Sequence, residues 1–181
     1  PKASEMPRCL MRMQNARIIA GMDNMAQGPI RVFLRTWGCT LNRSDSDIMS
    51  AILIKEGFML ARAPSEADVL VLNTCTVKGA TENKILAQLR KLSDGKAKIV
   101  VAGCLTVNKD RVRGDAPGAV LLGPGAIAKI GDAVRLAMRN EKADFAGFER
   151  KYALPRIAGG LIARVPIQEG CAGKCAFCQT R

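Results

Sequence analysis

The sequence predicts an α/β fold in which a parallel sheet carries helices on both faces. Four short apolar runs alternate with segments of helical periodicity, and such alternation is typical of parallel strands joined by crossover helices. The run at residues 68–72 is rich in Val and Leu and nearly continuous, as in strands that are covered on both faces. We therefore expect four strands, at residues 30–34, 68–72, 98–102 and 119–122.

A helix is predicted after each of these strands. The first begins where the run Asn42-Arg43-Ser44-Asp45 offers N-cap side chains, and it extends to Gly57. Its buried stripe is expected at Ile48, Ala51, Ile52 and either Ile54 or Lys55. The other helices are expected at residues 80–92, 107–113 and 127–139.

The chain is expected to divide into four segments. Residues 1–28 lack a clear period of either kind and are predicted to be a disordered extension. Residues 29–139 form the α/β domain, and residues 140–160 mix charges with glycine and proline, as linkers do. Residues 161–181 are expected to begin a second domain with a strand at residues 161–167.

The charge balance favours a polyanionic partner. The 181 residues include 28 Lys and Arg against 16 Asp and Glu, which gives a net charge of +12. Such a field attracts RNA, although a basic solvated surface without a partner has the same composition. No apolar run reaches the roughly 18 residues that a bilayer requires, so we expect a cytoplasmic protein with no membrane partner.

The cysteine and histidine counts indicate sulfur chemistry. Seven cysteines without an export signal do not suggest a disulfide framework, because the cytosol keeps thiols reduced and an odd count leaves one unpaired. The absence of histidine removes the commonest zinc ligand and the usual general base. Metal or redox chemistry at cysteine is therefore the better explanation.

The strongest motif is Cys171-Ala-Gly-Lys-Cys175-Ala-Phe-Cys178, which follows the last predicted strand. Three thiolates on one tight loop can hold three irons of a 4Fe–4S cubane and leave the fourth iron open, whereas electron-carrying clusters usually take four cysteines. A zinc knuckle is the alternative, but no fourth ligand lies nearby in the sequence.

A second set of cysteines is spread along the first domain. Cys39, Cys75 and Cys104 each follow the carboxyl end of a predicted strand, and in an open α/β sheet these ends meet at one crevice. Any one of them alone could be a small buried hydrophobe, but three at the same position relative to their strands suggest a second cubane. Asn42 and Asn73 flank the same loops and are expected to support the backbone there.

These motifs together resemble the methylthiotransferase family of radical S-adenosylmethionine enzymes. The resemblance covers residues 31–181. It is carried by Gly38-Cys39 with Asn42 and Asp45-Ser46-Asp47, Asn73-Thr74-Cys75-Thr76-Val77, Ala102-Gly103-Cys104, and Gly170-Cys171 with Cys175 and Cys178.

The resemblance implies two 4Fe–4S clusters. Cys171, Cys175 and Cys178 would hold the cluster that binds and cleaves S-adenosylmethionine, and the other triad an auxiliary cluster for sulfur insertion. The reaction replaces an unactivated C–H by C–S–CH3, and it needs an electron donor and a sulfur source. No catalytic residue beyond the cluster ligands is implied.

The resemblance also suggests a substrate. The segments Thr36-Trp37-Gly38-Cys39, Thr76-Val77-Lys78 and Thr81-Glu82-Asn83-Lys84 are most similar to the archaeal and eukaryotic branch. That branch acts on N6-threonylcarbamoyladenosine beside the anticodon of tRNA. Other branches act on another tRNA adenosine or on a ribosomal protein, and net charge does not separate them.

The family continues beyond the match, so residues 161–181 would be the start of a truncated radical S-adenosylmethionine (β/α) barrel, and the chain alone is expected to be inactive. Two readings of another class remain. One is a basic α/β RNA-binding module with structural zinc, and the other is an electron-transfer protein with two clusters.

Overall fold

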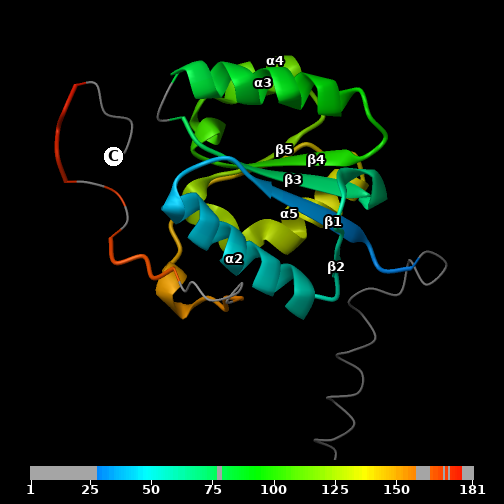
Figure 1. Ribbon diagram of the computed structural model, residues 1–181, viewed down its shortest axis with the longest axis horizontal. Coiled ribbons are helices and arrows are strands. Elements are labelled where there is room, and N and C mark those ends of the chain that lie inside the picture. Colours follow the sequence, from blue (N-terminus) through cyan, green and yellow to red (C-terminus); the bar gives the residue numbers. More distant parts are fainter. Residues whose placement is uncertain (1–27, 77–78, 158–163, 169, 171, 177–181) are drawn as a thin grey trace, which may run out of the picture.

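The computed structural model describes residues 28–76, 79–157, 164–168, 170 and 172–176. Within these residues, six parallel strands form one sheet in the order β2-β1-β3-β4-β5-β6 (Figure 1). The strands are β1 (Arg31–Thr36), β2 (Met59–Leu60), β3 (Val69–Thr74), β4 (Lys98–Gly103), β5 (Val120–Leu122) and β6 (Asp144–Phe145). The expected parallel sheet is confirmed, and the four predicted strands are β1, β3, β4 and β5.

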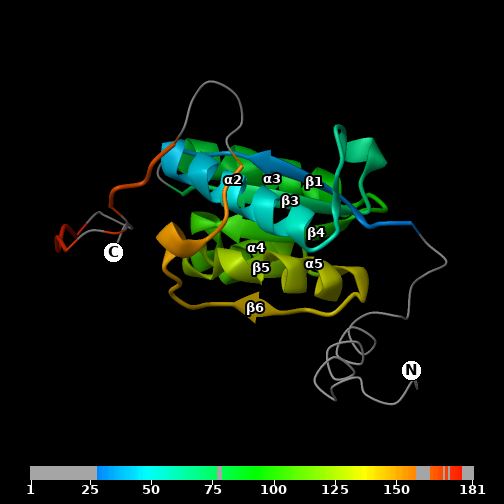
Figure 2. The same ribbon diagram turned by 90° about the horizontal axis from the view of Figure 1, so that it is seen from below.

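Helices cover both faces of the sheet, as predicted. Figures 1 and 2 show α3 and α4 on one face and α2 and α5 on the other. These helices are α2 (Thr40–Lys55), α3 (Gly79–Ser93), α4 (Lys109–Asp115) and α5 (Ile130–Met138), with short 3-10 turns η1 (Pro64–Glu66), η2 (Cys104–Val107), η3 (Pro124–Lys129) and η4 (Lys151–Ala153). None of the helices within the described ranges is both long and apolar enough to cross a membrane.

The strand β3 lies at the centre of the core. Successive side chains of a strand point to opposite faces, so Val69 and Val71 join the cluster under α2 and α5, while Leu70 and Leu72 join the cluster under α3. All six residues of β3 are buried. This two-sided burial is the physical reason for the continuous apolar run in the sequence.

The start of α2 differs from the prediction. The helix begins at Thr40, with Cys39 as its N-cap, so Asn42 and Asp45 are buried helix residues and not caps. Their side chains form hydrogen bonds with β3 and with the segment around Lys151. The sequence does not predict that this segment lies beside α2.

The buried stripe of α2 also differs in part. It consists of Ile48, Met49, Ile52 and Leu53, whereas the side chain of Ile54 is 52% exposed. Ile48 and Met49 lie four residues before Ile52 and Leu53, so these side chains share one face of the helix, and Ile54 lies outside that face.

The segment expected as a linker belongs partly to the sheet. Within residues 140–160, β6 pairs with β5 through Leu121–Asp144 and Leu122–Phe145, and η4 follows it. A two-residue edge strand carries no periodic signal, which is why the sequence did not predict it.

The strand expected at residues 161–167 is absent from residues 164–167, the part of this range that the structure describes. Residues 164–167 form no strand, and residues 161–163 lie outside the described ranges, as do residues 1–27 of the expected extension. A strand requires a neighbour for its hydrogen bonds, and the described part of the chain offers none there.

Candidate metal centre

Three cysteines lie at one end of the sheet. Cys75 follows β3 directly, Cys104 follows β4 directly, and Cys39 comes three residues after the end of β1. Because β1, β3 and β4 are neighbours and parallel, their carboxyl ends are adjacent. Cys75 is buried, Cys104 is half-buried and Cys39 is exposed, so the group is reachable from one side.

The thiols of this triad interact electrostatically. Burial raises the pKa of Cys104, and the neighbouring thiolates of Cys75 and Cys39 raise it further. The carboxylate of Asp45 also raises this pKa, while the Lys151 cation lowers it. Three thiolates in this position repel one another, and iron would remove that repulsion.

The possible ligands at this end of the sheet are the three thiols of the triad. Among the described residues, no three His, Cys, Asp or Glu side chains are arranged to hold one metal ion. A structural zinc takes four ligands around one centre, whereas three cysteine ligands of a cubane bind three separate irons. Cys39, Cys75 and Cys104 match in number the protein ligands of a cubane with one open iron, and their role as ligands stays a prediction.

Two asparagines hold the cysteine loops together. Asn42 Nδ2 donates to Asn73 Oδ1 at 3.2 Å and to the backbone oxygen of Thr74 at 3.0 Å. Asn73 Nδ2 donates to the backbone oxygen of Asn42 at 2.7 Å and to Ser46 Oγ at 2.9 Å. The Cys39 thiol donates to Asn42 Oδ1 at 3.2 Å. The predicted supporting role of these asparagines thus has a geometric basis.

Two glycines precede cysteines at points of close approach. A Cβ on Gly103 would lie 2.6 Å from Asn73 Oδ1 and would also overlap the backbone oxygen of Thr74, and the φ of Gly103 is +88°. A Cβ on Gly38 would overlap the side chain of Asn42. Only glycine fits at these positions, so the chain passes close to the asparagine pair just before Cys39 and Cys104.

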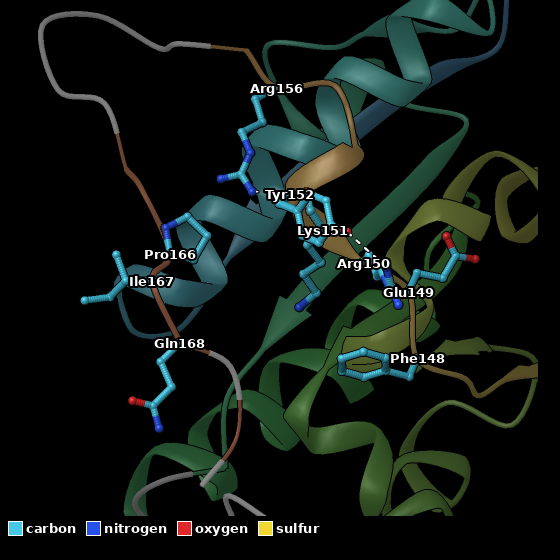
Figure 3. Close-up of a pocket in the computed structure, with 9 residues that line it drawn as sticks. All are labelled: Phe148, Glu149, Arg150, Lys151, Tyr152, Arg156, Pro166, Ile167 and Gln168. Atoms are coloured by element: carbon cyan, nitrogen blue, oxygen red, sulfur yellow. Dashed lines mark hydrogen bonds between the residues drawn. The ribbon is translucent and has the colours of Figure 1, made fainter.

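An ion pair near the triad was missed by sequence reasoning. Lys151 Nζ lies 3.0 and 3.1 Å from the two carboxylate oxygens of Asp45, and both side chains are only 5% exposed. Figure 3 shows Lys151 on the short segment that also carries Arg150, Tyr152 and Arg156. An acidic residue within a predicted helix is only a weak indication of a buried ion pair. Nothing in the sequence connects Lys151 with Asp45, because the two are 106 residues apart.

The second predicted triad lies mostly outside the described residues. Cys175 is described and exposed, whereas Cys171 and Cys178 are not described. The arrangement of this triad therefore remains a prediction from the motif.

The part of the chain that contains the triad matches a known protein family. Residues 31–123, which contain Cys39, Cys75 and Cys104, match the family described as "Uncharacterized protein family UPF0004". A relative from Methanothermobacter thermautotrophicus, named probable threonylcarbamoyladenosine tRNA methylthiotransferase, is 37% identical over 84% of this chain and 37% of its own length.

Two further relatives carry related names. The tRNA-2-methylthio-N(6)-dimethylallyladenosine synthase of Thermotoga petrophila is 38% identical over 82% of this chain and 35% of its own length. The threonylcarbamoyladenosine tRNA methylthiotransferase of Xenopus laevis is 27% identical over 88% of this chain and 30% of its own length. The chain thus spans 30–37% of the length of these relatives. From the matched range and these relatives, the chain belongs to the methylthiotransferase family whose shared domain is described as UPF0004.

Proposed function

We propose that this chain is the cluster-binding part of a tRNA methylthiotransferase, with Cys39, Cys75 and Cys104 as ligands of a 4Fe–4S cluster. The observation that carries the proposal is the meeting of three cysteine loops at the ends of three neighbouring strands. Three cysteine ligands leave one iron of a cubane open. When bound, such a cluster would supply a position for the sulfur or methylthio group that the reaction inserts.

The protein's own residues shape this site in two ways. Asn42 and Asn73 fix the loops through buried hydrogen bonds, so the thiols keep their relative positions before iron binds. Cys39 lies on the exposed side, which leaves the open side of the site facing solvent and substrate.

Cys171, Cys175 and Cys178 are proposed to hold a second 4Fe–4S cluster, which binds S-adenosylmethionine. The support is the motif and its order in the family. S-adenosylmethionine would serve as methyl donor and as radical source, and an external electron donor and a sulfur source complete the reaction.

We propose tRNA that carries N6-threonylcarbamoyladenosine beside the anticodon as the substrate. The names of the archaeal and Xenopus relatives support it, and the net charge of +12 suits a polyanion. The Thermotoga relative is equally similar and is named for another adenosine, so identity alone does not choose between tRNA substrates. A tRNA substrate also suggests a cytoplasmic site of action.

The test is anaerobic reconstitution with iron and sulfide, followed by iron analysis. Wild type should bind about eight irons per chain. The Cys→Ala triple at positions 39, 75 and 104 and the triple at positions 171, 175 and 178 should each bind about four. Cys9→Ala is the matched control, because Cys9 belongs to neither triad, and it should retain the full iron content.

Two results would overturn the proposal. Zinc in place of iron would favour the RNA-binding module with structural metal. Iron that neither triple reduces would show that it is bound elsewhere or adventitiously.

A further inference from the structure

Lys151 is a buried cation that comes from outside the cysteine-bearing part of the sheet. It lies in η4, beyond the sixth strand, and its side chain is 5% exposed. Burying a charge costs free energy that a partner must offset, and the Asp45 carboxylate contacts it at 3.0 and 3.1 Å through its two oxygens. A lysine at the surface would avoid this cost in free energy, so the burial of Lys151 needs an explanation.

Further contacts hold this segment on α2. Arg156 donates to Ser44 Oγ at 3.1 Å and to the backbone oxygen of Lys151 at 3.2 Å. Arg164 forms an ion pair with Asp47 at 3.1 Å. Figure 2 shows the segment that carries η4 alongside α2. Three polar side chains of α2, those of Ser44, Asp45 and Asp47, thus contact the segment that carries Lys151.

The same helix forms part of the cysteine site. Its N-cap is Cys39, its first turn contains Asn42, and Ser46 accepts a hydrogen bond from Asn73. Asp45 lies between Asn42 and Ser46 in the sequence, so the ion pair is next to the network that holds the loops. Asp45 also lies six residues after Cys39 on α2, or about 9 Å along the helix axis, since a helix rises about 1.5 Å per residue.

We propose that the Asp45–Lys151 pair sets the reduction potential of the cluster held by Cys39, Cys75 and Cys104. This inference rests on the proposed function, because it requires a cluster at that triad. Reduction adds negative charge to the cluster, which a nearby cation stabilises and a nearby anion destabilises. Charge and burial around a cluster are known determinants of its potential. Lys151 therefore raises the potential and Asp45 lowers it.

An electrostatic role predicts that removing Lys151 and removing Asp45 shift the reduction potential in opposite directions, which a structural role does not predict. Lys151→Met should shift the midpoint potential of the cluster downward, and Asp45→Asn should shift it upward. The double variant should return close to wild type, because it removes both charges and leaves no buried ion alone. Lys151→Arg keeps the charge and should also remain close to wild type.

The experiment is a redox titration of the reconstituted protein in which electron paramagnetic resonance monitors the reduced cluster. Cys171, Cys175 and Cys178 are replaced by Ala throughout, so that only one cluster titrates. The matched control is Arg135→Met, which removes a cation that contacts Glu56 at the far end of α2. That end lies roughly 25 Å from Cys39, since a helix rises about 1.5 Å per residue, and the potential should not move.

Each outcome decides one question. A parent protein that binds no iron at the first triad refutes the proposed function and this inference with it. A parent that binds about four irons, with Lys151→Met and Asp45→Asn shifting in the same direction or no more than Arg135→Met, refutes the inference alone. A shift of the double variant or of Lys151→Arg away from wild type would also contradict the proposal, and if one single variant does not fold, the direction of the shift in the other still tests it.

Discussion

Asn42 and Asn73 exchange two hydrogen bonds between the first turn of α2 and the end of β3. Asn73 donates to the Asn42 backbone at 2.7 Å, and Asn42 donates to the Asn73 side chain at 3.2 Å. Both side chains are at most 3% exposed. The helix that begins at Cys39 and the strand that leads to Cys75 are therefore joined by a buried polar contact.

Asn73→Ala should lower the free energy of unfolding by about 2–3 kcal/mol, because the substitution leaves buried donors and acceptors without partners. Asn42 and Ser46 would each lose a hydrogen bond to the Asn73 side chain. Urea unfolding of the metal-free chain measures the change. Asn83→Ala is the control, since Asn83 is exposed, and its effect should stay within about 0.5 kcal/mol. Equal effects of the two substitutions would contradict the role given to Asn73.

Gly103→Ala should lower the free energy of unfolding by about 2 kcal/mol or more, because the new Cβ meets the Thr74 backbone at a φ of +88°. Gly114→Ala is the matched control. Gly114 lies in α4 with nothing within 4 Å of an added Cβ, so stability should be unchanged or higher by up to about 1 kcal/mol. Thermal unfolding of the two variants would show the contrast, and a stable Gly103→Ala would mean that the turn before Cys104 is not constrained.

The central strands could be predicted because each is short, apolar and bounded by polar turns. The position of the cysteines then followed from topology, since residues after adjacent parallel strands share one edge of the sheet. The edge strand β6 could not be predicted in the same way, because Asp144 and Phe145 carry no pattern of their own. Its place depends on pairing with β5, which is a tertiary contact.

The polar contacts of α2 show a second limit of sequence reasoning. Asn42, Ser44 and Asp45 are good N-cap residues by type, so the sequence favours a helix that starts with them. In the structure they are buried inside the helix because their partners come from β3 and from the segment around Lys151. Such partners are distant in the sequence, and local preference cannot identify them.

The contact between β6 and α4 predicts a small pH dependence of stability. Burial alone would raise the pKa of Asp144, but hydrogen bonds and charges from Lys109 and Arg113 lower it overall below its usual value. A lowered pKa means that the unfolded chain takes up a proton first, so this contribution is present above the usual pKa and is lost as the pH falls through the folded value.

Asp144→Asn should therefore reduce stability near neutral pH by less than about 1 kcal/mol, since the carboxylate is partly exposed. The difference from wild type should vanish in acid, and concentrated salt should also reduce it. Urea midpoints between about pH 6 and about pH 3 measure both effects. A difference that persists in acid would point to a loss of packing and not of charge.

The thiol of Cys104 offers a test of the triad that needs no iron. Burial and the thiolates of Cys75 and Cys39 raise its pKa, so less of it is in the reactive thiolate form at a given pH. In the metal-free chain, the pH profile for alkylation of Cys104 should therefore lie above that of an ordinary cysteine. Cys39→Ser removes one like charge and should move the profile to lower pH. Timed alkylation followed by peptide mass spectrometry gives the rate at Cys104 alone. Cys9→Ser removes a thiol outside the proposed site and should leave the profile in place, whereas identical profiles for the two variants would show that Cys39 does not lie near Cys104.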